Sequence, residues 1–584
     1  MRSPPTPEPP LAEDRPRVQG VTDTGAPRTG ATRTGNRLEG HGGDIAVAVA
    51  RAHGVDTLFT LSGAHVFPLY DAAVKADPPM RLVDVRHEQT AVFAAEATAK
   101  LTRRPGFAAL TAGPGVTNGV SAITTAHLNG SPMLVMGGRA PAFRWGAGSL
   151  QELDHPPLLA PVTKRAATVA TVGEIAGAVE DALSLATAPH RGPVFLDVPM
   201  DQLFSRAEVE LPGASQRRRA DPDPDDLARV AKLLAGAERP VLVIGSDVWT
   251  DGAEEAARRL AETAGIPVIT NGMGRGILPA GHPLLVTRAR GAAFGGADLV
   301  VVVGVPLDFR LGFGVFGGRE GATPAPVVHL ADSPGQLATH VELAGSAAGD
   351  LSSVLDGVLD GWTRAGRPAA YDQWTSALQD AARAAVDKDR DLLASDADPI
   401  HPARIYGELG SRLADDAVVI GDGGDFVSYA GKYVEPKAPG GWLDPGPYGC
   451  LGTGLGYAIG ARLARPSGQV VLMLGDGAAG FSLMDVDTLV RHGLPVVMVM
   501  GNNGGWGLEK HPMRFLYGYD VAAELAPQTR YDQVVTALGG AGELVTKPGE
   551  IGAALDRAFD AGVPYLVNVV TDPEVAYPRS TNLA

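Results

Sequence analysis

The chain of 584 residues contains one cysteine, Cys450. A single thiol excludes an intramolecular disulfide and any zinc site that is built from several cysteines. Because secreted domains commonly carry disulfides, this absence is typical of a protein that works in a reducing compartment. We therefore expect a cytoplasmic protein that is held together by its hydrophobic cores.

Long apolar runs and basic clusters are also missing. The longest apolar runs, such as Leu299–Val303 and Val496–Met500, are far shorter than the roughly 18 residues that a membrane-spanning helix needs. The formal net charge is −16, and the triplet Arg217–Arg219 is too small to form a nucleic-acid surface. The sequence therefore predicts neither a membrane protein nor a nucleic-acid-binding protein.

What is present is typical of a large globular protein. Apolar residues make up 45% of the chain and charged residues 20%, and a chain of this length is too long for one hydrophobic core. Residues 1–38 are an exception, because they are rich in Pro, Arg, Thr and Gly and have almost no apolar periodicity. We expect them to form a disordered tail.

Short apolar strands alternate with helical segments through the rest of the chain, which indicates parallel α/β structure. A segment rich in Pro, Asp and Arg at 212–226 and a helical segment rich in Ala and Asp at 352–397 are expected to be linkers. They divide the chain into three doubly wound parallel-sheet domains, at 39–211, 220–360 and 395–584. The second is Rossmann-like, although it has no G-x-G-x-x-G motif.

The third domain contains the most informative stretch. A buried strand, Val470–Leu474, runs into the turn Gly475–Gly477, a helix is predicted over Phe481–Arg491, and a second strand, Pro495–Met500, ends at Asn502–Asn503. In such a β-α-β unit both turns lie at the carboxyl ends of neighbouring parallel strands. Open α/β sheets bind their ligands at that edge.

The side chains at these turns are suited to a metal-bound diphosphate. Asp476 offers a carboxylate oxygen, Asn503 an amide oxygen and Gly505 a main-chain carbonyl, all of which are hard ligands for Mg²⁺. Gly477 and Ala478 are small enough for their backbone N–H groups to approach a phosphate at the start of the helix. The stretch therefore predicts a site for a diphosphate together with magnesium.

These motifs resemble those of a known enzyme superfamily. The unit from Gly475–Gly477 to Asn502–Asn503 resembles the thiamine diphosphate signature of the acetolactate synthase, pyruvate decarboxylase and 2-hydroxyacyl-CoA lyase superfamily. Arg86–Glu88 before an Ala-rich helix looks like the pyrimidine-domain motif of that family, and Gly113–Gly115 with Asn118 is also similar. The likeness covers residues 42–584.

The resemblance implies a domain order and a set of site residues. The three domains would be pyrimidine-binding, central and diphosphate-binding, and Asp476, Asn503 and Gly505 would hold Mg²⁺. Glu88 would share a proton with the aminopyrimidine ring and so favour loss of the proton at the thiazolium carbon. Leu451 falls where the family has the apolar wedge that bends the cofactor. The implied cofactor contacts are Gly113, Pro114, Asn118, Gly424, Asp425, Leu451, Gly452, Gly477, Ala478 and Trp506.

Several of these residues also have an ordinary structural explanation. A carboxylate such as Glu88 suits the first turn of any helix, and an asparagine such as Asn118 often caps a turn. For Trp506, packing in the core and a backbone contact with the phosphates are equally open. Cys450 is best explained as a small apolar side chain.

The resemblance favours an acetolactate synthase-like enzyme that makes or breaks a C–C bond beside the carbonyl of a 2-oxo acid such as pyruvate. The acetolactate synthases have a Gln-Trp pair that shapes the pocket for the acceptor substrate, and this pair is absent from Gly504–His511. Other segments look closer to the 2-hydroxyacyl-CoA lyases. They are Gly148–Asp154, Asp308–Leu311, Trp442–Gly446 and Gly456–Gly460.

Two alternatives therefore stay open. One is a 2-hydroxyacyl-CoA lyase or an oxalyl-CoA decarboxylase-like enzyme, with an acyl-CoA substrate. The other is a catalytically silent, nucleotide-binding regulatory protein, against which the presence of Glu88 with Asp476 and Asn503 argues. In different members of the family the central domain binds FAD, binds ADP or is empty, so the resemblance allows all three for this chain. The family pairs the domains of Glu88 and Asp476 across subunits, which implies a homodimer, or a dimer of dimers, with active sites at the interface.

Overall fold

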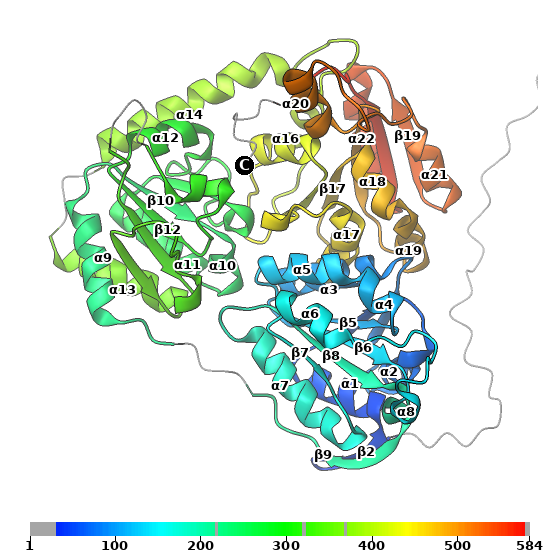
Figure 1. The fold of residues 1–584 in the computed structure, drawn as a ribbon. Helices are drawn as coiled ribbons and strands as arrows, with labels where there is room; N and C mark the ends of the chain where they lie inside the picture. Colours follow the sequence, from blue (N-terminus) through cyan, green and yellow to red (C-terminus); the bar gives the residue numbers. More distant parts are fainter. Residues whose placement is uncertain (1–30, 216–219, 318–322, 367–370, 578–584) are drawn as a thin grey trace, which may run out of the picture.

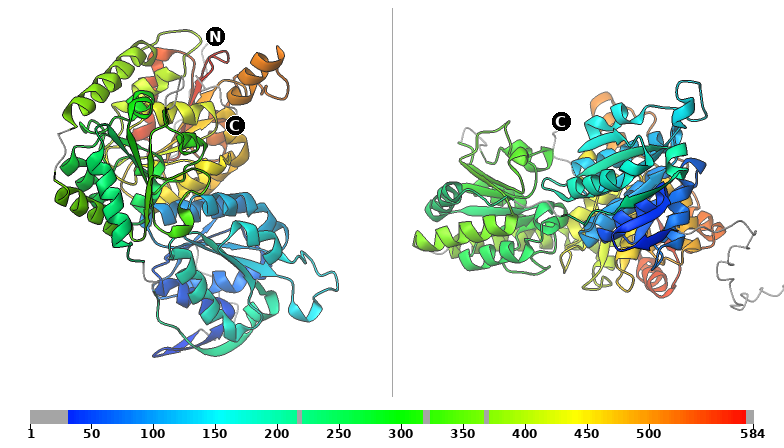
Figure 2. Two further views of the ribbon diagram at one scale, coloured as in Figure 1. Left: turned by 60° about the vertical axis from the view of Figure 1, so that its left-hand side comes forward. Right: turned by 90° about the horizontal axis from the view of Figure 1, so that it is seen from below.

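The computed structural model describes residues 31–215, 220–317, 323–366 and 371–577. Figure 1 shows three lobes, an N-terminal, a central and a C-terminal domain, and each is built around a sheet of its own. Figure 2 shows the central domain beside the other two, which pack closely against each other. The predicted three α/β domains are confirmed. No helix in the described ranges is long and apolar enough to cross a membrane.

The N-terminal domain has a six-stranded sheet in the order β4-β3-β5-β6-β8-β7, and all of its pairings are parallel. Helices cover both faces, so its central strands are buried and apolar. The strands are β3 Thr57–Thr60, β4 Arg81–Asp84, β5 Gly106–Leu110, β6 Met133–Arg139, β7 Arg165–Thr168 and β8 Pro193–Pro199. The helices are α1 Gly42–Ala52, α2 Phe67–Lys75, α3 Glu88–Thr102, α4 Pro114–Asn118, α5 Val120–Leu128, α6 His155–Leu159, α7 Ile175–Thr187 and α8 Met200–Phe204.

The central domain has a parallel five-stranded sheet in the order β11-β10-β12-β13-β14. Its middle strand is the apolar run of one Leu and four Val residues at Leu299–Val303, and all five are buried. The strands are β10 Pro240–Ile244, β11 Val268–Thr270, β12 Leu299–Val303, β13 Val327–Ala331 and β14 Gly345–Ala348. The helices are α9 Pro224–Gly236, α10 Ser246–Thr250, α11 Glu254–Ala264, α12 Arg290–Gly296 and α13 Leu351–Arg364.

The C-terminal domain has a parallel six-stranded sheet in the order β16-β15-β17-β18-β20-β19. The strands are β15 Val418–Asp422, β16 Trp442–Leu443, β17 Val470–Gly475, β18 Val497–Asn502, β19 Ala541–Val545 and β20 Tyr565–Val570. The helices are α15 Ala403–Gly410, α16 Asp425–Tyr433, α17 Thr453–Ala464, α18 Asp476–Ser482, α19 Val486–Arg491, α20 Gly507–Tyr517, α21 Tyr531–Ala537 and α22 Ile551–Asp560.

The predicted tail, residues 1–38, ends too late in the sequence. Residues 1–30 lie outside the described residues, but Thr32–Thr34 (β1) and Arg37–His41 (β2) are strands. β2 pairs antiparallel with β9, Arg206–Glu210, at the far end of the domain. Leu38 is buried against the core, so this segment is ordered by a partner strand that local composition does not reveal.

The predicted linker at 352–397 is also partly wrong. α13 places Val354, Leu355 and Val358 in the core of the central domain, so this helix belongs to that domain. α14, Asp372–Leu393, runs from the central to the C-terminal domain. Its Leu378 is buried with the central sheet, so α14 also packs on the central domain, while its helical path between the two domains agrees with the predicted linker.

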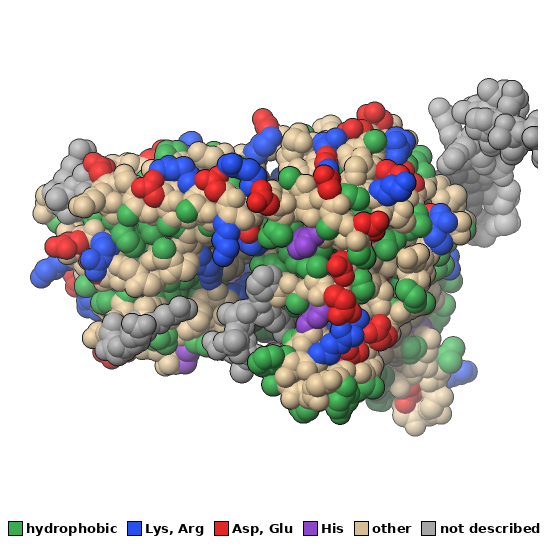
Figure 3. All heavy atoms as spheres, turned by 90° about the horizontal axis from the view of Figure 1, so that it is seen from above, with side chains coloured by type: hydrophobic (Ala, Val, Ile, Leu, Met, Phe, Trp, Pro, Cys, Tyr) green, Lys and Arg blue, Asp and Glu red, His purple; other side chains and the backbone are tan. Residues whose placement is uncertain are grey.

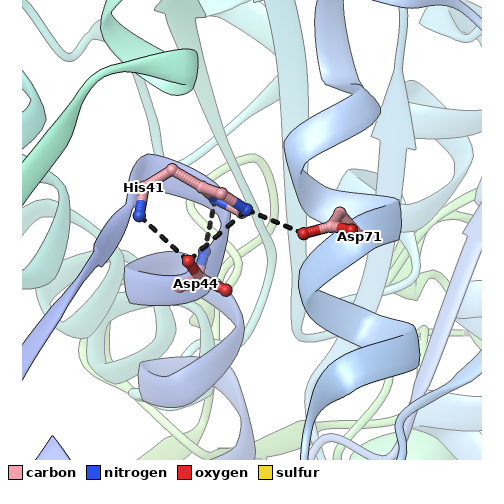
Figure 4. Close-up of side chains that lie close together, drawn as sticks. All are labelled: His41, Asp44 and Asp71. Carbon is pink, nitrogen blue, oxygen red and sulfur yellow. Dashed lines mark hydrogen bonds and ion pairs between the residues drawn. The ribbon is translucent and has the colours of Figure 1, made fainter. Parts of the chain in front are cut away.

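A cluster of His41, Asp44 and Asp71 marks the start of α1 (Figure 4). The His41 Nδ1 atom accepts from Asp44 N at 3.1 Å, and His41 N donates to the Asp44 carboxylate at 2.9 Å. This is a reciprocal cap of the helix N-terminus. His41 Nε2 lies 3.1 Å from Asp71, so the cluster is explained by helix capping.

The N- and C-terminal domains meet along α3 and α17. Glycines let the two helices approach closely, since a Cβ atom at Gly460 would lie 2.3 Å from the Ala94 carbonyl oxygen. Beside them the rings of Phe93 and Tyr457 meet edge to face at 5.8 Å. The Tyr457 hydroxyl donates to Glu96 at 2.9 Å. The helix that begins with Glu88 is therefore tightly fixed to the C-terminal domain.

Candidate active site

The predicted ligand edge of the C-terminal sheet is present. β17 and β18 are parallel neighbours, with Gly475 opposite Gly501, so the turns that follow them are adjacent. Asp476 is almost fully buried and accepts from Gly477 N at 3.0 Å and from Gly504 N at 2.8 Å. The second turn is closed by a bond from Gly505 N to Asn503 Oδ1 at 3.2 Å.

Asp476, Asn503 and Gly505 line one cavity. Burial raises the pKa of Asp476 to about 6, although its bonds from the N–H groups of Gly504 and Gly477 counteract the rise. A cation at this position would offset that burial. The set of one carboxylate, one amide oxygen and one carbonyl oxygen fits Mg²⁺, so the donors match the predicted metal.

The same cavity collects the residues predicted to contact the diphosphate. These are Gly424, Asp425, Gly477, Ala478 and Trp506. The Trp506 ring packs over Gly477, where a Cβ atom would lie 2.7 Å from it, and it meets Phe481 edge to face at 6.4 Å. The side chain of Trp506 is therefore a wall of the cavity. Leu508, which the sequence analysis does not single out, forms another part of the lining.

The helix predicted over Phe481–Arg491 is interrupted. α18 ends at Ser482, a short turn follows at Leu483–Asp485, and α19 begins at Val486. Phe481 and Met484, two of the apolar residues at helical spacing in this segment, are 53% and 52% exposed. Val486 and Leu489 of the same apolar pattern are buried in the core, so the pattern is buried only in α19.

The turn with Leu451 and Gly452 is held by the carboxylate of Asp422, which is not among the predicted site residues. Asp422, at the end of β15, accepts from Gly452 N at 3.0 Å and from Gly454 N at 2.8 Å. Burial raises the pKa of Asp422 to about 6. The sequence did contain a signal for Asp422, because it follows a buried strand. Polar residues at strand ends also identified the turns after β17 and β18.

Glu88 begins α3 and is buried. Asn118 Nδ2 donates to Glu88 Oε2 at 3.1 Å, so the structure brings these two predicted residues together. The turn that includes Gly113 and Pro114 lies beside them, since a Cβ atom at Gly115 would be 3.7 Å from Glu88 Oε1. These residues form the pyrimidine-side half of the predicted site.

A buried chain of side chains supports that turn and was missed in the sequence. Gly113 N donates to His155 Nε2 at 3.0 Å, and His155 Nδ1 lies 2.9 Å from Asp197. Arg139 also donates to Asp197, at 2.9 Å. The partners are separated by 42 or more positions, so no local pattern could reveal them.

The two halves of the predicted site are separate within one chain. Glu88 is not among the residues that line the cavity of Asp476, Asn503 and Gly505. Leu451 instead lines a second cavity, between the central and C-terminal domains.

Models of three enzyme-family domains match this chain in order. They are the N-terminal TPP binding domain of thiamine pyrophosphate enzymes at residues 40–158, the central domain at 227–358 and the C-terminal TPP binding domain at 422–569. Thiamine pyrophosphate is another name for thiamine diphosphate. The chain belongs to the thiamine pyrophosphate enzyme family.

Relatives of this thiamine pyrophosphate enzyme fall in the two branches that the sequence suggested. It is 51% identical over 549 residues to "Acetolactate synthase large subunit IlvG" of Mycobacterium tuberculosis, covering 93% of this chain and 98% of the relative. It is 35% identical to "2-hydroxyacyl-CoA lyase 2" of Mus musculus, covering 87% and 85%. For the human protein of that name the values are 34%, 87% and 86%.

These findings confirm an acetolactate synthase-like enzyme that has thiamine pyrophosphate-binding domains. The hypothesis of a catalytically silent regulatory protein gains no support from them. The second cavity of this thiamine pyrophosphate enzyme has a volume of about 970 Å³. Its basic lining residues are Arg275, Arg288, Arg290, Arg310, Lys388 and Lys432.

The cations of this cavity are only partly neutralised. Asp389 accepts from Arg288 and lies 2.8 Å from Lys432, and Asp308 pairs with Arg310 at 2.7 Å. Burial, followed by the charges of Arg275 and Arg310, lowers the pKa of Arg290 to about 10. An anionic group would be stabilised in this cavity.

The outer face in Figure 3 differs from the cavity, because acidic and basic side chains of the described residues are interspersed on it.

Proposed function

We propose that this enzyme uses thiamine diphosphate and Mg²⁺ to form a C–C bond beside the carbonyl of a 2-oxo acid, with pyruvate as the substrate. The observation that carries the proposal is the 51% identity, over 93% of the chain, to a protein named as an acetolactate synthase large subunit. Glu88, Asp476 and Asn503 are all present at positions that suit this chemistry. The single cysteine favours a cytoplasmic enzyme.

The C-terminal half of the site would hold the diphosphate end of the cofactor. Asp476, Asn503 and the Gly505 carbonyl would bind Mg²⁺, and the backbone N–H groups of Gly477 and Ala478 would face a phosphate at the start of α18. When bound, the cofactor supplies an electron sink for cleavage and formation of bonds at a carbonyl carbon. The chain itself supplies position and the exclusion of water.

The N-terminal half would act on the ring. The Glu88 carboxyl would exchange a proton with a ring nitrogen, and its bond from Asn118 at 3.1 Å holds it in place. Leu451, fixed through Gly452 and Asp422, would support the bent shape of the cofactor.

We propose a homodimer, or a dimer of dimers, in which Glu88 of one copy meets Asp476 of the other. The separation of the two half-sites within one chain supports this arrangement. Exposed apolar side chains rim both halves. Phe481, at 53% exposure, touches Trp506, and Leu150, at 81%, adjoins Gln151, which lies against Gly113. A second copy would cover them.

A specific observation favours a second candidate, a 2-hydroxyacyl-CoA lyase. The arginine-lined cavity reaches Leu451, Trp506 and Glu509 of the catalytic domain, and its charge and size suit the phosphates of a coenzyme A ester. The same features suit FAD or ADP. An oxalyl-CoA decarboxylase-like enzyme would use the cavity in a similar way.

A substrate panel tests the proposal. The purified protein, loaded with thiamine diphosphate and Mg²⁺, is offered pyruvate alone and, separately, a 2-hydroxyacyl-CoA. We expect acetolactate from pyruvate. Cleavage of the acyl-CoA to an aldehyde and formyl-CoA, with no product from pyruvate, would replace the first candidate by the second. A protein that binds the cofactor but converts neither substrate would contradict both.

A further inference from the structure

Asp485 connects the C-terminal domain to the start of α3 within one chain. It lies in the short turn between α18 and α19, on the segment that starts with Asp476. Its side chain is 1% exposed. Asp485 Oδ1 accepts from the backbone N–H of Arg86 at 2.8 Å, and Oδ2 accepts from the Thr90 hydroxyl at 2.6 Å. The two donors stand on either side of Glu88.

The hydrogen bonds from Arg86 and Thr90 to the Asp485 carboxylate belong to a strong class. Hydrogen bonds to an ionised carboxylate are shorter and stronger than neutral ones, and a negative charge at the N-terminus of α3 is favoured by the helix dipole. Thr488 donates a third bond to Asp485, at 2.9 Å, which fixes the acceptor on its own side. Both threonine side chains are buried, so water does not compete for these bonds.

Neighbouring contacts between the same two segments are of a different kind. Arg491 pairs with Asp84 at 2.8 Å, and Asp487 lies 3.6 Å from the Arg86 guanidinium. The side chains in these pairs are 26% to 53% exposed, and exposed ion pairs contribute little to stability. They join the surfaces of the two domains. Asp485 instead reaches the backbone and the first turn of the helix that begins with Glu88.

We propose that Asp485 is a positioning residue that fixes the N-terminus of α3, and with it the Glu88 carboxyl, against the C-terminal domain of the same chain, so that Glu88 is held in place for a cofactor bound at the Asp476 site of the other copy. This inference rests on the proposed function, since it assigns Asp485 a role in the proton exchange of Glu88. Asn118 holds the Glu88 carboxyl from the side of α4. Asp485 holds the backbone on which that carboxyl is mounted.

The role can be separated from cofactor binding. Asp476, Asn503 and Gly505 form the predicted metal site without Asp485, which is not part of the cavity lining. Loss of Asp485 should therefore leave the affinity for thiamine diphosphate and Mg²⁺ nearly unchanged. A displacement of Glu88 by about 1 Å would slow proton removal by about 10- to 100-fold.

The test compares Asp485→Ala, Asp485→Asn and the control Asp487→Asn in the full-length protein. Exchange of the C2 proton of bound thiamine diphosphate for deuterium is measured by NMR after acid quenching, at saturating cofactor and Mg²⁺. Cofactor affinity is measured separately from the quenching of tryptophan fluorescence. Asparagine can still accept from Arg86 N and can donate to Thr90, so it should restore most of the exchange rate.

We expect Asp485→Ala to slow exchange by about 10-fold or more, with an affinity within about threefold of the wild type, and the control to behave as the wild type. An unchanged exchange rate in Asp485→Ala, or affinity and exchange falling together, would overturn the inference. Wild-type exchange no faster than that of the free cofactor would contradict the proposed function instead.

Thr90→Val provides a second route if Asp485→Ala does not fold. It removes one hydroxyl and keeps the side-chain volume, so it should slow exchange by about 2- to 10-fold, the equivalent of one buried hydrogen bond. Wild-type exchange in this variant would overturn the role of Asp485.

Discussion

Replacement of Gly460 by alanine tests the contact between α3 and α17, where two opposing effects can be compared. Alanine in place of a mid-helix glycine stabilises a helix by about 1 kcal/mol. Against this, the new Cβ atom would lie 2.3 Å from the Ala94 carbonyl oxygen and 2.8 Å from the Ala97 Cβ atom. The helices would have to separate by about 1 Å to restore ordinary contact distances.

The steric effect should exceed the gain in helix propensity. The closest atom belongs to the backbone of α3 and cannot rotate away, and overpacking of this kind costs about 1–3 kcal/mol. With the upper value, the net loss is about 2 kcal/mol. For domains of this size we expect a fall in Tm of about 4–8 °C.

The measurement is thermal unfolding followed by circular dichroism, with Gly177→Ala as the matched control. Gly177 lies in α7 and has nothing within 4 Å of an added Cβ atom. The control should be stabilised by about 0.5–1 kcal/mol. A Gly460→Ala protein that is as stable as the wild type, or more stable, would refute the close packing of the two helices.

Three further predictions concern the two halves of the site. Asp476→Ala should abolish Mg²⁺-dependent binding of thiamine diphosphate, as measured by calorimetry, because it removes the only charged ligand of the predicted metal site; binding at wild-type affinity would exclude Asp476 as a ligand. Phe481→Asp should convert the oligomer to monomers in light scattering, since it places a charge in the apolar rim, and an unchanged mass would place the interface elsewhere. Asp197→Ala removes the partner of His155 Nδ1 and leaves Arg139 with only the exposed Asp154, so we expect a loss of about 3 kcal/mol in urea unfolding, the lower end for a broken buried pair; a loss below about 1 kcal/mol would contradict the supporting role of this hydrogen-bonded group.

The diphosphate half of the site was predictable because its signals are local. Each buried strand ends at a polar turn, and parallel neighbours bring such turns together. The pairing of Gly475 with Gly501 places Asp476 beside Asn503, as the spacing predicts. The central strands are apolar at nearly every position because both faces of each sheet are covered, and this indicates the α/β class.

The features that were missed depend on partners far away in the sequence. Residues 37–41 are ordered by β9, about 170 positions later, and nothing in their composition reveals that strand. Asp485 contacts Arg86 and Thr90 across almost 400 positions. Phe481 fits a helical apolar pattern, but periodicity does not tell whether an apolar face packs on its own chain or on another surface.

Complementation between two inactive variants tests the central claim, that Glu88 and the Asp476 site work together across two copies. Glu88→Gln and Asp476→Ala are co-expressed with different tags, and the mixed dimer is purified and assayed for acetolactate formation. Each mixed dimer contains one intact site, so we predict about half of the wild-type activity, with each variant inactive alone. An inactive mixed dimer would contradict a site shared between subunits.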